Sequence, residues 1–98
     1  MEKKYFMLKF LPRKPNFAQT MTDEDRKIVV QHHEYWKKHV DSGIALLFGP
    51  VFDPKGTFGI CIVAVDSERE ISKLMENDPA SNIHNYEYYP MNAVTPAK

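Results

Sequence analysis

The order of strand-like and helix-like segments is the feature that most constrains what this chain can fold into. Runs rich in aromatic and β-branched residues predict strands, and apolar residues at helical spacing predict helices. Six such segments follow one another, at residues 5–11, 22–43, 44–51, 57–65, 67–78 and 86–91. The resulting β-α-β-β-α-β order predicts an α+β fold of the ferredoxin-like kind, an antiparallel sheet with both helices on one face.

Local signals mark the ends of the first helix. Thr22, with Asp25 three residues later, is a plausible capping box that begins the helix, and Gly43 stands where a helix C′ residue is expected. Residues 12–21, which precede the helix, are expected to form a loop. This long helix is the clearest of the predicted elements.

The second half of the chain carries similar signals. Ser67 with Glu70 is a second capping box, and it predicts a helix of about three turns that Pro79 limits. Residues 52–56 contain Asp-Pro and Gly, which are turn residues, so the two central strands should form a hairpin. Pro90 cannot donate a ladder hydrogen bond, which places the last strand at a sheet edge.

Two of the predicted strands are apolar on both faces. In each of them apolar residues occupy both alternating sets of positions. The two sets of the first strand are Phe6, Leu8, Phe10 and Tyr5, Met7, Leu11. Those of the third strand are Phe58, Ile60, Ile62 and Cys61, Val63, Val65. Helices can cover only one face of the sheet, so the other face would be a large exposed apolar patch. We therefore expect a homodimer in which two sheets pack face to face.

Length and charge narrow the classes of function. At 98 residues the chain is expected to be one domain, residues 1–98, and its 13 basic and 13 acidic side chains balance. That balance argues against nucleic-acid binding and membrane-surface anchoring, which usually need a basic excess. The single cysteine, Cys61, permits no intramolecular disulfide, and no segment reaches the length of a membrane span, so we expect a soluble cytoplasmic protein.

A histidine occupies the apolar side of the first predicted helix. At about 100° per residue, His32 falls near the middle of the arc that carries Ile28, Val29, Trp36 and Val40. An imidazole can gain or lose a proton near neutral pH, so this position suits a general acid or base. The alternative is a neutral, hydrogen-bonded histidine with a structural role only.

An aspartate is placed in a similar way on the second predicted helix. Asp78 follows Ile71, Leu74 and Met75 at helical spacing, at the C-terminal end where the macrodipole disfavours an anion. A buried carboxylate needs a partner. The two helices lie side by side in this fold, so we expect a His32–Asp78 pair in which the carboxylate orients the imidazole. The alternative is a helix-terminal residue bonded locally before Pro79.

Other residues are candidates for the wall of a pocket. Trp36 lies beside His32 on the helix, although such an aromatic residue is more often part of a core or an interface. Gly49 and Pro50 end the second strand, where Gly49 could leave space for a ligand, and Asp53 follows in the turn. Turn geometry alone is the simpler reading of these three residues.

Metal binding and nucleophilic catalysis find little support. Three of the four histidines lie within residues 32–39, but none has the i, i+4 spacing of a helical zinc site, and His84 would have to join from elsewhere in the fold. Cys61 lies within an apolar strand, and no nucleophile-elbow or phosphate-loop motif occurs. We expect neither a metal nor an organic cofactor.

Taken together, these residues resemble the YciI-like (YCII-related) family. The resemblance extends over nearly the whole chain and rests on motifs in a fixed order, namely His32, Tyr35-Trp36, Gly43, Gly49-Pro50, Asp53, Gly56, Asp66-Ser67, Asp78-Pro79 and Pro90. It implies a ferredoxin-like, dimeric α/β-barrel fold, with the family's characteristic histidine and aspartate at His32 and Asp78. The chain has Ala80-Ser81-Asn82 where the family commonly carries a bulky aromatic residue, so the pocket wall should differ there.

Two hypotheses of function follow. In the first, the protein is a lyase, isomerase or hydrolase-like enzyme acting on a small aromatic or enolisable molecule, and His32 transfers a proton while Asp78 orients it. A related dehydrochlorinase of a chlorinated hydroxyhydroquinone is the clearest chemistry that the resemblance implies. In the second, the protein is a non-catalytic ligand-binding or assembly domain, and the pair joins two helices.

Overall fold

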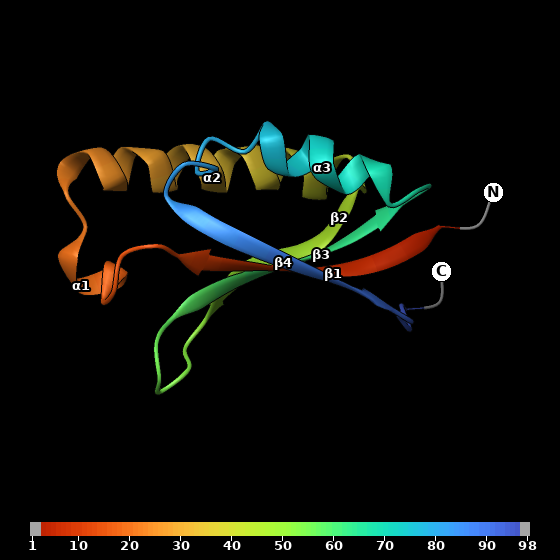
Figure 1. The fold of residues 1–98 in the computed structure, drawn as a ribbon. Coiled ribbons are helices and arrows are strands. Elements are labelled where there is room, and N and C mark those ends of the chain that lie inside the picture. The colour runs from red at the N-terminus through yellow and green to blue at the C-terminus, as the bar shows by residue number, and fades with distance from the viewer. Residues whose placement is uncertain (1–2, 97–98) are drawn as a thin grey trace.

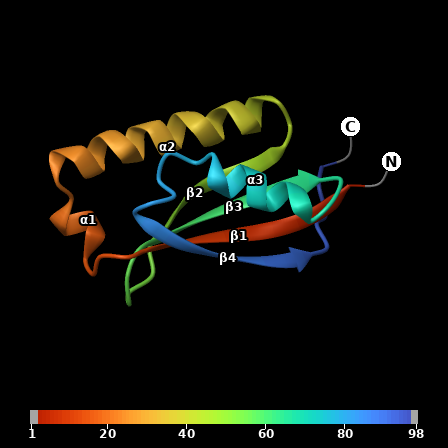
Figure 2. The same ribbon diagram turned by 45° about the horizontal axis from the view of Figure 1, so that its top comes forward.

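The computed structural model describes residues 3–96 and shows the predicted element order (Figure 1). Its elements are β1 (Lys4–Pro12), α1 (Phe17–Thr20), α2 (Asp23–Asp41), β2 (Ala45–Val51), β3 (Phe58–Val65), α3 (Arg69–Glu76) and β4 (His84–Met91). The strands form one antiparallel sheet in the order β2-β3-β1-β4. Helices α2 and α3 lie on the same face of it (Figures 1 and 2). The ferredoxin-like α+β prediction is confirmed.

Helix α2 begins and ends where the sequence predicts. The Thr22 side chain accepts from the backbone N–H of Asp25, and the Asp25 carboxylate accepts from the backbone N–H of Thr22, which completes the capping box. Gly43 adopts φ +87° just beyond the helix, a conformation that glycine tolerates best. These caps fix where the helix begins and ends, and therefore the position of His32 along the sheet.

Helix α3 is shorter than predicted. The Glu70 carboxylate accepts from the backbone N–H of Ser67, but the Ser67 side chain forms no cap, so only half of the second capping box is present. The helix spans 8 residues and ends at Glu76. Asp78 therefore lies beyond it, in a turn where its own carboxylate accepts from the backbone N–H of Ala80. The prediction that Asp78 belongs to the helix is wrong.

Two further boundaries differ from the expectation. Residues 17–20, expected within a loop, form the short helix α1, which follows Asn16 in the left-handed conformation at φ 53°. Strand β4 begins at His84, two residues earlier than predicted, because residues 84 and 85 continue the pairing with β1. It lies at the sheet edge, as Pro90 indicates.

The core lies between the sheet and the helices. It is formed by Phe6, Leu8 and Phe10 of β1, Cys61, Val63 and Val65 of β3, and Trp36, Ile71, Leu74 and Met75 of the helices. The opposite alternating set, which includes Tyr5, Met7, Ile60 and Ile62, lies on the open face and is half-buried. None of the helices in residues 3–96 has the length and apolar character needed to cross a bilayer.

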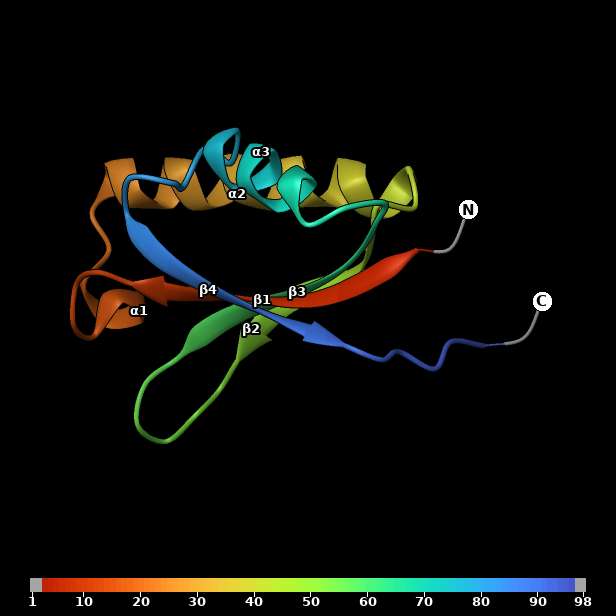
Figure 3. The same cartoon turned by 45° about the vertical axis from the view of Figure 1, so that its right-hand side comes forward.

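The β2–β3 hairpin closes through the predicted turn. The backbone N–H of Gly56 donates to the carbonyl of Asp53 at 2.9 Å, and the Asp53 carboxylate accepts from the backbone N–H of Lys55 at 2.9 Å. This turn and α1 lie at the same end of the sheet (Figures 1 and 3). They flank the end at which the candidate site opens.

Candidate active site

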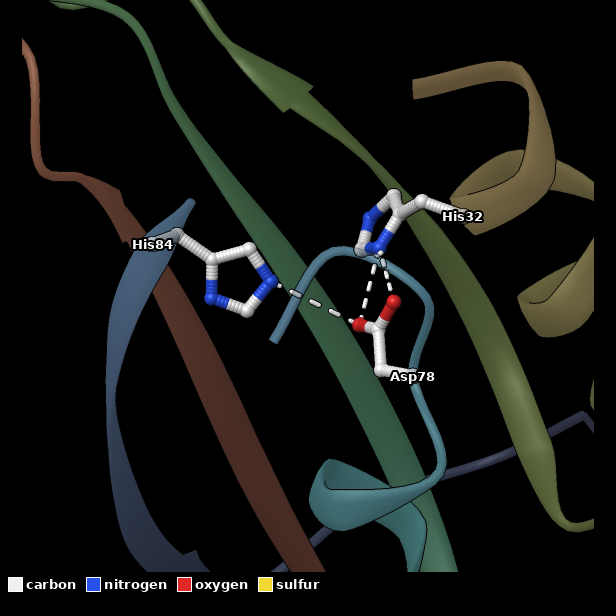
Figure 4. A group of neighbouring side chains, drawn as sticks. All are labelled: His32, Asp78 and His84. Carbon is white, nitrogen blue, oxygen red and sulfur yellow. Dashed lines mark hydrogen bonds and ion pairs between the residues drawn. The ribbon is translucent and has the colours of Figure 1, made fainter. Parts of the chain in front are cut away.

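His32 and Asp78 form the predicted pair (Figure 4). The imidazole Nδ1 lies 2.8 Å from both carboxylate oxygens. The Asp78 side chain is fully buried, whereas 19% of the His32 side chain is exposed. Because Nδ1 faces the carboxylate, Nε2 is the ring nitrogen that remains for a ligand.

Two further donors hold the Asp78 carboxylate. The indole N–H of Trp36 donates to Oδ2 and the backbone N–H of Ala80 donates to Oδ1, both at 2.9 Å. Burial raises the pKa of Asp78, but hydrogen bonds from His32 and Ala80, together with the nearby His84 imidazole, more than offset this. The net pKa lies well below the usual range for an aspartate, so the buried group is a carboxylate at neutral pH.

His84 stands on the other side of the same carboxylate. It comes from the first position of β4, and its Nε2 lies 3.5 Å from Asp78 Oδ2, longer than a hydrogen bond but within the range of an ion pair. Only 8% of its side chain is exposed, and neither ring nitrogen has a hydrogen-bond partner in residues 3–96. Buried nitrogens without hydrogen bonds destabilise a fold, so the contact with Asp78 is the polar interaction that His84 offers in this site.

The three side chains offer ligand atoms that all lie within 4.8 Å of one another. A divalent ion would need bonds of about 2.0 to 2.2 Å to nitrogen and oxygen ligands. The His32 Nδ1 lies at hydrogen-bond distance from both oxygens of Asp78, so the imidazole would have to move away from the carboxylate before an ion could bind between them. The arrangement as it stands is a hydrogen-bonded His–Asp pair with a second imidazole beside it.

A cavity of about 360 Å³ opens in front of His32. Its wall is almost entirely apolar, and the residues that line it include Phe10, Phe17, Met21, Val29, Phe48, Phe52, Ile60 and Ile83. The histidines His32, His33 and His84 supply the titratable groups of this wall. Ala80 also lines it, at the position where the sequence predicted a changed pocket wall. The volume suits a small organic molecule.

The other predicted site residues take different places. Gly49 and Pro50 line the cavity with His32. Trp36 does not: it is fully buried behind Asp78 and holds the carboxylate through its indole. Asp53 lies outside this cavity as well and lines a neighbouring groove near the hairpin turn.

His84 is the residue that the sequence pattern did not assign to the site. The predicted strand began at residue 86, two positions too late. In a strand, alternate residues share a face, so one more step back from Tyr86 places His84 on the side of the helices. That extension of the period-two pattern is the signal that could have found it.

Cys61 is buried on β3 and poorly suited to act as a nucleophile. Burial raises the pKa of its thiol to about 12, and the charge of Asp78 adds to the effect. The reactive thiolate form is therefore disfavoured at neutral pH. The titratable groups that line the cavity are therefore His32, His33 and His84.

The fold and the site together define a small α+β domain with a buried His–Asp pair at the wall of an apolar cavity. The chain belongs to the YCII-related family, whose domain model matches residues 6–94. This match confirms the resemblance carried by the sequence motifs. No curated protein sequence matches the chain.

Proposed function

We propose that this protein is an enzyme in which His32 takes up and returns a proton on a small, largely apolar substrate. The observation that carries the proposal is the position of His32. One nitrogen is held by the buried Asp78 carboxylate at 2.8 Å, while the ring lines a cavity large enough for a small molecule. A base oriented in this way is typical of general acid–base catalysis.

The pair divides the chemical task. With Nδ1–H donated to Asp78, the lone pair of Nε2 is available to accept a proton from the substrate. The carboxylate then stabilises the imidazolium that forms, and it remains charged because its pKa is low. Trp36 and Ala80 fix the carboxylate, so the orientation of His32 is set by groups outside the cavity.

The cavity wall indicates the kind of substrate. An apolar lining excludes water and strengthens the electrostatic interactions of the few polar groups within it. It offers few hydrogen bonds for a sugar or another strongly hydrated molecule. An aromatic or aliphatic molecule with one activated C–H bond, such as an enolisable ketone, matches this wall and an imidazole base.

The open face of the sheet supports a homodimer. It carries half-buried apolar residues of β1 and β3, and Leu47 of β2 is 51% exposed there. An exposed apolar surface of this kind is typical of a protein interface. A second copy of the chain would cover it symmetrically. The proposed assembly is a dimer with sheets packed face to face.

The acid–base role is tested by hydrogen exchange at carbon. A panel of small apolar ketones in heavy water is followed by proton NMR, and the loss of the signal next to the carbonyl is measured with and without the protein. We expect faster exchange for at least one ketone and loss of the acceleration in His32→Gln, which keeps a polar side chain but removes the base.

His33→Gln is the matched control, because His33 also lines the cavity but packs against Phe48 instead of Asp78. It should retain the acceleration. If no ketone exchanges faster, or if His32→Gln and His33→Gln behave alike, His32 is not the base. The His32–Asp78 pair would then join two parts of the fold without catalysis.

A further inference from the structure

A second hollow, a groove of about 570 Å³, adjoins the apolar cavity. It lies between the β2–β3 turn and the segment around α1, at the end of the sheet where both are seen in Figure 3. The two hollows share lining residues, namely Pro12, Phe17, Ala18, Thr57 and Phe58. The two hollows are therefore neighbours at this end of the sheet.

The groove differs from the cavity in its chemistry. Its charged lining residues are Lys9, Lys14, Lys55 and Asp53. The ammonium of Lys14 is already paired with Asp25 at 2.9 Å, and it also donates to the carbonyl of Thr20. With Lys14 paired to Asp25, two cations, Lys9 and Lys55, stand against one anion, Asp53, so the groove keeps a positive excess that favours a negative group.

Two of these lysines lack an anionic partner. Within residues 3–96, no carboxylate lies within ion-pair distance of Lys9 or Lys55. Lys9 lies on the open face of β1, opposite Ile60, with its ammonium 4.6 Å from the centre of the Phe58 ring. An ammonium that contacts an aromatic ring and has no carboxylate partner gains from an added anion.

We infer that the ligand of this protein is an organic acid whose compact apolar body fills the cavity at His32 and whose anionic group lies in the groove against Lys9 and Lys55. The inference rests on the proposed function for the end of the ligand at His32 and extends it to the other end. The apolar body is recognised by shape and burial, and the anion by charge. The anionic group lies away from the reacting carbon, so it contributes to binding and orientation.

Two fluorescent probes of the same skeleton test this inference. Anilinonaphthalene sulfonate carries the apolar body and an anion, and phenylnaphthylamine is the same body without the sulfonate. Each is titrated into the full-length protein and into Lys9→Met, Lys55→Met and the control Lys73→Met, an exposed lysine of α3 remote from the groove. Methionine keeps the length and the apolar stem of lysine, so the fold should be retained.

We expect the protein to bind the sulfonate probe more tightly than the neutral one. Lys9→Met and Lys55→Met should each weaken the sulfonate probe by about threefold to fivefold, the scale of one partly exposed charge pair. Binding of the neutral probe should stay constant in both variants, and Lys73→Met should change neither probe. Added salt should reduce the preference for the sulfonate.

Equal binding of the two probes, or equal weakening of both by the lysine variants, would overturn the inference, as would a complete failure to bind the sulfonate probe. The result is independent of catalysis. His32→Gln tests the base through hydrogen exchange at carbon, whereas the sulfonate preference is a binding difference that depends on the lysines. If one of the two experiments gives a negative result, the other can still be interpreted.

Discussion

Asp78→Ala should be among the most destabilising substitutions in the chain. The change removes the acceptor of three hydrogen bonds, from His32, Trp36 and Ala80. The N–H groups of Trp36 and Ala80 are buried, and an orphaned buried donor costs about 1 to 3 kcal/mol. His32 faces the cavity, where water can reach it, so its loss should be smaller.

The two buried donors together predict a loss of about 2 to 6 kcal/mol. The smaller loss at His32 adds to this and release of the buried charge subtracts from it, so a net loss of about 2 to 4 kcal/mol is expected, a large share of the stability of a small domain. Urea unfolding, followed by circular dichroism and by the fluorescence of Trp36, measures it. The midpoint should fall by about 2 M at an unchanged slope.

Asp41→Ala is the control for this measurement. Asp41 pairs with Lys37 on the exposed side of α2, where both side chains are more than half exposed, and its removal should change stability by less than about 0.5 kcal/mol. If Asp78→Ala costs less than about 1 kcal/mol, the scale of a surface pair, then Asp78 does not hold Trp36 and Ala80 as described.

Three other outcomes are expected. The pKa of Asp78 is lower in the folded than in the unfolded protein, so its stabilising effect is present above the unfolded pKa and is lost as pH falls below about 4. The free energy of unfolding of Asp78→Asn should therefore fall less steeply with decreasing pH. An identical pH dependence of the two proteins would argue against a lowered pKa. His84→Phe should raise the thermal midpoint, because the cost of two buried nitrogens without hydrogen bonds exceeds the gain from the 3.5 Å contact with Asp78, and a lower midpoint would show that this contact outweighs that cost. Sedimentation equilibrium should give a dimer that Ile62→Lys on the open face converts to monomer, whereas a stable monomer at micromolar concentration would rule out the proposed assembly.

The parts of the fold that depend on local signals were predictable. The capping box of Thr22 and Asp25 lies within four consecutive residues, and the turn residues Asp53, Pro54 and Gly56 predict the hairpin. Helix α3 was less predictable because two local preferences compete at its end. Pro79 disfavours helical backbone at Asp78, and the Asp78 carboxylate offers the backbone N–H of Ala80 a different partner.

The site was predictable only in part. His32 and Asp78 could be paired because the helical pattern placed each on an apolar side and the fold brings together two segments that are 46 positions apart in the sequence. Trp36 shares the helical face of His32, but its hydrogen bond to Asp78 depends on the side-chain rotamer of Trp36 and on how deeply the indole is buried. The cavity depends on α1 and on the packing of Phe48, which no local pattern encodes.

Hydrogen exchange at carbon, compared between His32→Gln and His33→Gln, tests the central claim most directly. Both variants replace one imidazole of the same cavity wall with the same side chain, and only one of them removes the partner of Asp78. His32→Gln should slow exchange of the responsive ketone by about 100-fold or more, the usual contribution of a general base, while His33→Gln should stay close to the unmodified protein. Equal rates in a folded His32→Gln protein and the unmodified one would contradict a role of His32 as the base.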